Sequence, residues 1–168
     1  MLQEKSAEID ANLAVTAQTW YSRAKDIDKS IQKEQEILLS DAAKTDRSEN
    51  AVYQIASDNY ARLQVSKRDI DNKIEAYERY NREYVPSEYI TIGTTVKLKI
   101  LSENGQTPSR GQRVFYIKIV PSDLGVARIG AITENSAVGK AIRGKYNGDT
   151  FKVHTRKGEI EYLIEEVY

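Results

Sequence analysis

The acidic residues Asp46 and Glu49 are the side chains in this sequence whose types and spacing most directly suggest chemistry. They stand three positions apart, so in a turn both carboxylates can converge on one side. Two converging carboxylates can hold a divalent cation incompletely and leave coordination positions for water and for substrate oxygens. The same spacing also occurs in an ordinary solvated turn that caps a helix, so the pair alone leaves both interpretations open.

The remaining composition excludes several other kinds of catalytic or metal site. The 168 residues include no cysteine, which excludes disulfides, thiolate zinc sites, iron–sulfur clusters and cysteine nucleophiles. One histidine, His154, is too few for a histidine-rich metal site and makes a Ser-His-Asp hydrolase a poor candidate. Gly139-Lys140 lacks the preceding glycine and the following serine or threonine of a phosphate-binding loop, so nucleotide hydrolysis is unsupported.

Charge is balanced over the whole chain but not within it. The part up to Tyr84 carries 13 basic and 16 acidic residues, and the part after it carries 12 and 9. Neither part is basic enough to indicate a nucleic-acid binder. Between Arg110 and Lys157, ten basic residues against three acidic ones could contact phosphate or form the solvent-facing side of a sheet. No apolar run approaches the roughly 18 residues that span a bilayer, and no secretory signal is visible, so we expect a cytoplasmic protein without a membrane partner.

The first half of the chain is predicted to form two long helices. All nine glycines and all three prolines follow Tyr84, so this half lacks the residues that break helices. Apolar residues recur there at spacings of three and four in two stretches, which we call the two seams. Two seams of similar length predict an antiparallel coiled-coil hairpin over residues 1–84, with arms of roughly 36 residues and a length of about 50 Å. The seams consist of Leu13, Ala17, Trp20, Ala24, Ile27, Ile31 and Leu38, and of Ala56, Tyr60, Leu63, Ile70, Ile74, Tyr77 and Tyr84, with polar interruptions at Glu34, Lys67 and Asn81.

The segment between the arms, near residues 41–50, is predicted to be the tip of the hairpin. It contains no large apolar side chain, and its serine, threonine and aspartate residues are typical of turns and helix caps. Thr45 or Asp46 could cap the second helix, and Glu49 would then lie in its first turn. The acidic pair is therefore expected at the end of a long rod, where it stabilises little but could be delivered into a cavity.

After Pro86 the hydrophobic period changes to two, which is typical of strands. Alternation predicts four strands, with Arg156-Lys157-Gly158 as a hairpin turn, and the small apolar stretch Ser136–Arg143 predicts one short helix. The fold class is therefore α+β: the helical hairpin is followed, over residues 85–168, by a compact antiparallel sheet with one short helix across it. The predicted strands are Thr94–Leu101, Arg113–Val120, Thr150–Thr155 and Glu159–Val167.

Several segments together resemble the bacterial transcript cleavage factors GreA and GreB. The predicted tip, residues 46–53 (Asp-Arg-Ser-Glu-Asn-Ala-Val-Tyr), resembles the Asp-x-x-Glu-Asn-Ala-x-Tyr signature at the coiled-coil tip of that family. Residues 135–142 resemble its Asn/Asp-Ser-Pro-[Ile/Met]-Ala-x-Ala/Gly-Leu segment, with Ala137 in the place of the proline. Further matches are the strand start Gly93–Val96 and the closing strands Glu159–Tyr162 and Glu166–Tyr168.

The resemblance implies a fold and a mode of action. It implies an N-terminal coiled coil and an FKBP-like C-terminal domain, similar to FK506-binding proteins. Such factors insert the hairpin through the secondary channel of bacterial RNA polymerase, while the globular domain rests on the rim of that channel. By motif match, Asp46 and Glu49 would help hold a second Mg²⁺ and the attacking water at the polymerase active centre, where backtracked RNA is cut and its 3′ piece released.

The same resemblance assigns roles to further residues. Asn135, Ser136 and Ala137 are the expected polymerase contacts, and Asn50 and Tyr53 the expected support of the tip. The polymerase would supply the first metal and the 3′ end of the nascent RNA, so this protein, expected as a monomer, would complete an active site without being an enzyme alone. Mg²⁺ is expected only in that complex, because an isolated Asp/Glu pair binds this strongly hydrated ion weakly.

Two alternatives remain open from the sequence. Some relatives occupy the same channel and inhibit synthesis, but they usually carry a different acidic cluster, so the presence of both Asp46 and Glu49 favours cleavage. An FKBP-like module could instead belong to a peptidyl-prolyl isomerase or chaperone. Such isomerases line a pocket with several aromatic residues, whereas this module has Phe115, Phe151 and a few tyrosines. The first hypothesis explains the long glycine-free rod best.

Overall fold

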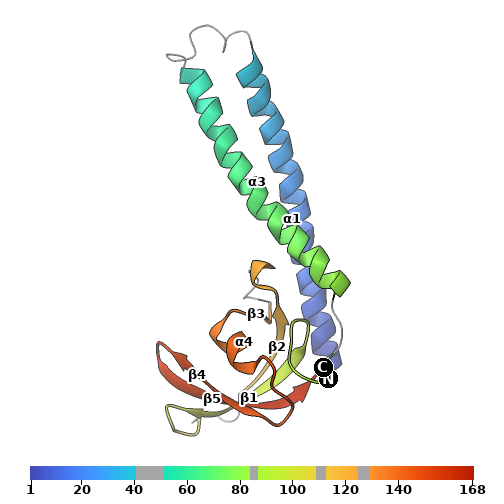
Figure 1. The fold of residues 1–168 in the computed structure, drawn as a ribbon, viewed down its shortest axis with the longest axis vertical. Coiled ribbons are helices and arrows are strands. Elements are labelled where there is room, and N and C mark those ends of the chain that lie inside the picture. The colour runs from blue at the N-terminus through green and yellow to red at the C-terminus, as the bar shows by residue number, and fades with distance from the viewer. Residues whose placement is uncertain (41–50, 84–86, 109–112, 125–128) are drawn as a thin grey trace. The chain divides into compact units, whose positions relative to one another are not determined.

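The structure, a computed structural model, describes residues 1–40, 51–83, 87–108, 113–124 and 129–168 (Figure 1). The chain divides into two compact units, which are described separately: one comprises Thr16–Glu75, and the other combines Met1–Val15 with Ala76–Tyr168. The predicted domain boundary after residue 84 lies among residues 84–86, outside the described residues. No helix in the described ranges is long and apolar enough to cross a membrane.

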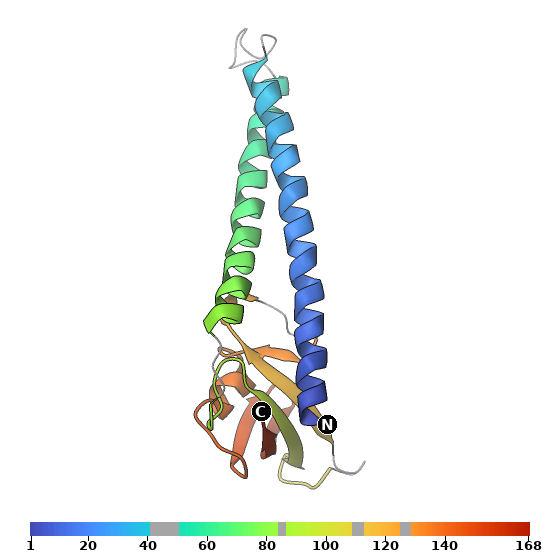
Figure 2. The same ribbon diagram turned by 90° about the vertical axis from the view of Figure 1, so that its right-hand side faces the viewer.

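The unit Thr16–Glu75 is a pair of long helices, as predicted (Figures 1 and 2). Helix α1 spans Leu2–Leu39 and helix α3 spans Ala51–Glu83. The helices are antiparallel, because residues earlier in α1 contact residues later in α3: Gln35 contacts Tyr60, and Asp28 contacts Lys67. Their shared core contains the predicted seam residues Trp20, Ala24, Ile27, Ile31, Tyr60, Leu63, Ile70 and Ile74.

Two of the three polar interruptions of the seams, Glu34 and Lys67, contact the opposite helix. The Asn59 amide Nδ2 donates a hydrogen bond of 3.4 Å to Glu34 Oε1. Lys67 Nζ lies 3.1 Å from Asp28 Oδ1 on α1 and 3.2 Å from Asp71 Oδ2 on its own helix. Hydrogen bonds to Asp28 and then Asp71 raise the pKa of the Lys67 ammonium above its ordinary value. The interruptions therefore help to set how the two helices pair.

The end of the α3 seam differs from the prediction. Ala76 and Tyr80 are buried, whereas the predicted Tyr77 is only half-buried and Asn81 is exposed. These residues belong to the other unit, where α3 has different neighbours, so the stripe that packs shifts around the helix. Tyr84 lies outside the described residues.

The second unit is built on a five-stranded sheet of order β3-β2-β1-β5-β4. Its strands are β1 Thr95–Glu103, β2 Val114–Val120, β3 Ala131–Thr133, β4 Thr150–Thr155 and β5 Gly158–Val167. The four predicted strands and the β4–β5 turn are confirmed to within two residues at each end. The prediction of a wholly antiparallel sheet is wrong at one edge, since β3 pairs parallel with β2. Three residues are too few for strand alternation to show, so β3 was not predicted.

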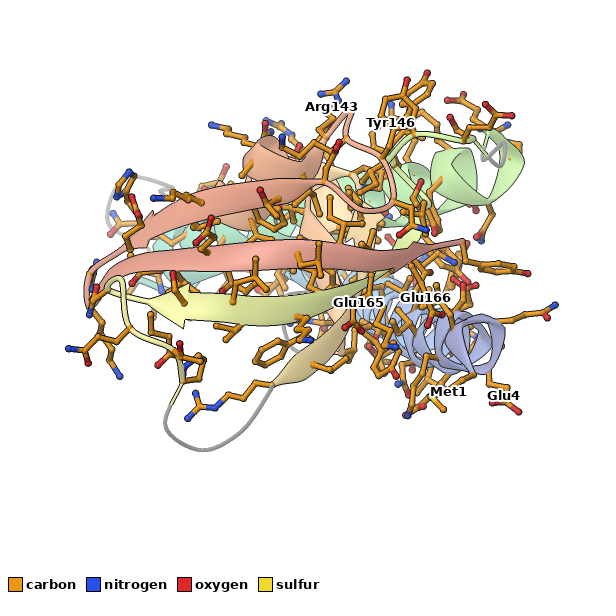
Figure 3. All side chains as sticks on the ribbon, turned by 90° about the horizontal axis from the view of Figure 1, so that it is seen from below. Met1, Glu4, Arg143, Tyr146, Glu165 and Glu166 are labelled. Carbon is orange, nitrogen blue, oxygen red and sulfur yellow. The ribbon has the colours of Figure 1, made fainter. Side chains whose placement is uncertain are left out.

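The two faces of this sheet carry different helices. The main core lies on the face covered by helix α4, which spans Ala137–Ile142. The first turns of α1 lie on the opposite face, where Ser6 and Asp10 contact Thr95 and Lys118. In Figure 3, which looks onto the strands, Arg143 and Tyr146 lie beyond one edge of the sheet, and Met1 and Glu4 lie beyond the other, on α1. The core consists of Ile90, Val96, Leu98, Ile119, Ile142, Phe151, Val153 and Ile164. A short 3-10 helix, η1, spans Ser122–Leu124.

Candidate functional site

The predicted polymerase contacts, residues 135–137, lie between β3 and the start of α4 and include the first residue of that helix; we call them the docking loop. Asn135 and Ala137 are exposed and Ser136 is half-buried. Ser136 caps α4: its backbone is extended at φ −65° and ψ 160°, and its Oγ accepts a hydrogen bond of 3.0 Å from the Gly139 amide. Serine is among the preferred residues at this position because its oxygen satisfies an amide that has no partner within the helix.

Gly139 sets how closely α4 approaches the end of β3. A Cβ atom at this position would lie 2.3 Å from the carbonyl oxygen of Thr133 and 3.0 Å from that of Glu134. The missing side chain therefore lets the first turn of the helix lie directly against strand backbone. Arg143, just after the helix, also contacts the residue that follows β3: its Nη1 lies 3.3 Å from Glu134 Oε2. This ion pair joins the segment before α4 to the segment after it.

An open apolar pocket of about 150 Å³ adjoins the docking loop. Val138, in the first turn of α4, connects the loop to the pocket, and Phe115 at its edge is 42% exposed. Tyr162 stacks on Phe151 with ring centroids 5.1 Å apart, and burial raises the pKa of its phenol above the ordinary value. The pocket is lined by Leu98, Phe115, Ile117, Ile132, Val138 and Tyr162.

The lining of this pocket is suited to binding an apolar group. No carboxylate, amine or imidazole lines it, and the titratable group in its lining is the phenol of Tyr162. It can bury an apolar side chain, since exposed aromatic surface around a concave apolar patch is typical of an interaction site. Sequence reasoning did not identify this pocket. The alternation of β2 indicated that Phe115 and Ile117 share a face, but the opening depends on how α4 covers that face.

The predicted catalytic pair is not among the described residues. Asp46, Glu49 and Asn50 all lie within residues 41–50, so their contacts and any Mg²⁺ site remain predictions. The neighbouring elements are described: α1 ends at Leu39, α3 begins at Ala51, and Tyr53 is half-buried in the first turn of α3. Elsewhere, across the described ranges, no group of three or more histidine, aspartate and glutamate side chains could hold a metal ion.

Comparisons with known proteins agree with the arrangement of elements. The family described as "Transcription elongation factor, GreA/GreB, C-term" matches residues 85–168. Transcription elongation factor GreA of Prosthecochloris aestuarii is 30% identical over 123 residues, covering 73% of this chain and 73% of that protein. GreA of Chlorobium phaeobacteroides is 29% identical over 153 residues, covering 88% of this chain and 92% of the relative.

The solved structure of Gfh1 from Thermus aquaticus is also similar. It is 18% identical and covers 90% of this chain and 92% of its own, with a TM-score of 0.39. The family match over the second half and the GreA relatives, which extend into the helical half, agree with the order of modules in this chain. The chain therefore belongs to the GreA/GreB family of transcription elongation factors.

Proposed function

We propose that this protein enters the secondary channel of bacterial RNA polymerase and stimulates cleavage of backtracked nascent RNA. Its family supports a role in transcription elongation and thus polymerase as the partner. The observation that carries the cleavage activity is the match of residues 46–53 to the tip signature, with the acids at both of its positions. The helix pair α1 and α3 on either side of this segment supports delivery of the acids from a rod.

Attachment to the polymerase is assigned to the docking loop and the apolar pocket. Asn135 and Ala137 are exposed next to a pocket that Val138 helps to line. An apolar side chain from the rim of the channel could enter this pocket and cover Phe115, while the loop contacts the surrounding backbone. Burial of one such side chain stabilises a complex by about 1.5–3 kcal/mol. We assign this surface to affinity, because its lining is largely apolar and holds no carboxylate that could bind the metal ion.

The chemistry is assigned to Asp46 and Glu49. Carboxylate oxygens are the protein ligands that Mg²⁺ prefers, so this donor set fits the ion but fills only part of its six-coordinate shell. The ion, when held jointly with polymerase ligands, would activate water and stabilise the leaving oxygen of a phosphodiester. Asp46 and Glu49 would hold and orient the ion and water. The protein then acts as a monomeric cytoplasmic activator of the polymerase nuclease and is not an enzyme by itself.

The test is RNA sizing in purified backtracked elongation complexes. With Mg²⁺ present, the protein should shorten the RNA from its 3′ end much faster than polymerase alone does, and Asp46→Asn or Glu49→Gln should remove most of the gain. Asp58→Asn is a matched control, because Asp58 is an exposed acid on α3 outside the tip signature. If the protein leaves the RNA length unchanged and slows nucleotide addition, it is an inhibitor that uses the same partner.

A further inference from the structure

A buried lysine joins the first helix to the sheet. Lys118 on β2 is 3% exposed, and its Nζ lies 2.6 Å from both carboxylate oxygens of Asp10 on α1, whose side chain is 47% exposed. The same ammonium lies 3.3 Å from the hydroxyl of Ser6, which accepts a hydrogen bond of 2.8 Å from Thr95 Oγ1. We call Ser6, Asp10, Thr95 and Lys118 the clip. The docking loop, the pocket and the predicted tip include none of these four residues.

One side of the first turns of α1 is buried, and on this side Ser6 and Ile9 contact the sheet region around the clip. Leu2, Ser6, Ile9 and Leu13 are all buried, and their spacings of four, three and four place them on one side of a helix. Ile9 packs so close to β3 that a Cβ atom added at Gly130 would lie 3.2 Å from its Cγ1. Apolar contacts therefore supply attraction along this face, and the clip places a charged pair at its centre.

The clip favours one seating of the helix over its alternatives. Among the described residues, every buried side-chain nitrogen and oxygen has a hydrogen-bond partner. Sliding or rotating α1 on the sheet would leave the Lys118 ammonium buried without its carboxylate, which is costly even where the intact pair adds little net stability. Apolar contacts alone tolerate small shifts, so the ion pair is the element that specifies the register.

We propose that the clip is a positioning element for the cleavage function, an inference that rests on the proposed function. Helix α1 is continuous from Leu2 to Leu39 and leads directly into the segment that contains Asp46 and Glu49. The sheet under its first turns carries the docking loop. The clip thus joins the helix that presents the catalytic acids to the sheet that attaches to the polymerase. Asp10 and Lys118 act through α1 and do not touch RNA or metal.

The first arm of the test measures the seating of α1 directly in the full chain. Hydrogen–deuterium exchange should become faster within residues 1–15 in Lys118→Met and in Asp10→Asn, while exchange in residues 16–39 stays as in the wild type. The double variant Asp10→Leu, Lys118→Met should recover slow exchange, because apolar side chains of similar volume can replace an ion pair whose ammonium is buried. Unchanged exchange within residues 1–15 in both single variants would overturn the proposal.

The second arm separates positioning from attachment. In titrations of backtracked complexes, the single variants should keep the half-saturating concentration within about two-fold and lose about ten-fold or more of the maximal cleavage rate, since a misplacement of about 1 Å can cost about a hundred-fold. Glu8→Gln is the matched control: it breaks an exposed ion pair with Lys5 on the same helix and should change neither quantity. The double variant should regain the maximal rate.

The outcomes distinguish this inference from the proposed function. Faster exchange in residues 1–15 together with a wild-type maximal rate would show that the clip holds the helix but does not position the acids, and would overturn the inference. A wild-type protein that fails to stimulate cleavage would overturn both the proposed function and the positioning role. In that case the exchange arm would still decide whether the clip holds α1. Circular dichroism of each variant checks that the fold is retained.

Discussion

At the scale of single residues, Ala137 is the departure from the family pattern that the structure explains best. It is the first residue of α4, directly after the capping residue Ser136. Proline is favoured at the first helical position because its missing N–H is not needed there and its φ is already helical. The extended backbone of Ser136, with ψ of 160°, also suits the residue before a proline. The site is thus compatible with proline without a change of backbone.

Ala137→Pro should therefore stabilise the protein by about 0.4–1 kcal/mol, because it removes freedom from the unfolded chain. If the gain appears wholly in binding, polymerase affinity should rise by at most about five-fold. The maximal cleavage rate should not change, since Asp46 and Glu49 are untouched. Urea unfolding and competition for the polymerase measure the two effects. A changed rate at saturating protein, with constant affinity, would contradict this separation of attachment from chemistry.

Gly158 is the residue on which the β4–β5 turn depends. Its φ is +124°, and a Cβ atom there would lie 1.7 Å from Asn104 Oδ1. That oxygen accepts a hydrogen bond of 2.9 Å from the Glu159 amide, so it cannot move away without cost. Gly158→Ala should destabilise the protein by more than about 1 kcal/mol in urea unfolding. Lys157→Ala, at an exposed neighbouring position, should stay within about 0.5 kcal/mol of the wild type.

At the scale of elements, the polar residues within the helix pair can be tested through their charge. Asp28 contributes the cross-helix carboxylate to Lys67. Asp28→Asn should reduce the free energy of unfolding by about 0.2–1 kcal/mol, the usual range for partly exposed ion pairs. Asp26→Asn is the control, because Asp26 pairs with Lys29 within the same helix and makes no cross-helix contact in the described pairs. Urea unfolding at neutral pH measures both.

The effect of Asp28→Asn should depend on pH. The folded state raises the pKa of Lys67 above its ordinary 10.5, so the pair contributes fully below that pH and its contribution is lost as the pH rises through the folded value. The difference in unfolding free energy between wild type and Asp28→Asn should therefore shrink at strongly alkaline pH. A difference that stays constant across this range would show that Asp28 acts through packing or helix propensity and not through its charge.

Elements with a long, regular pattern could be predicted from the sequence, and short ones could not. Seam spacing predicted both α1 and α3, and alternation predicted β1, β2, β4 and β5, because each pattern repeats several times. The three-residue strand β3 shows no such repeat and is defined by its pairing with β2. Tyr77 had a suitable spacing, yet Ala76 and Tyr80 are buried in its place, because the neighbours of α3 change along its length.

At the scale of the whole molecule, the features that sequence could not predict depend on packing between elements distant in the chain. Lys118 alternates with apolar residues and was expected either to contact phosphate or to face solvent. It is buried because the first turns of α1 cover that face of the sheet. The apolar pocket also needs β1, β2, β3, β5 and α4 together. By contrast, the tip acids and the docking loop could be proposed from the sequence because each is a local motif, and their roles stay predictions.

The proposed function separates attachment and chemistry along the chain, and two variants can test this division. Phe115→Ser removes a 42% exposed aromatic ring from the lining of the pocket, so it should weaken polymerase binding about ten-fold, or about 1.4 kcal/mol, which is less than the roughly 3–5 kcal/mol for losing a fully buried Phe. At saturating concentrations its maximal cleavage rate should match that of the wild type. Asp46→Ala should show the opposite: binding within a few-fold and a cleavage rate lower by orders of magnitude.

A mixture of the wild-type protein and Asp46→Ala gives the most specific test of this division. Because Asp46→Ala keeps the docking loop and the pocket, it should occupy the polymerase and exclude the wild-type protein, so that excess variant inhibits cleavage competitively. The inhibition constant should equal the variant's own binding constant within about two-fold, and added wild-type protein should reverse it. The double variant Asp46→Ala, Phe115→Ser should lose the inhibition, because it lacks the attachment surface. Failure of Asp46→Ala to compete would show that the tip acids serve attachment, and the assignment of chemistry to the tip alone would then be wrong.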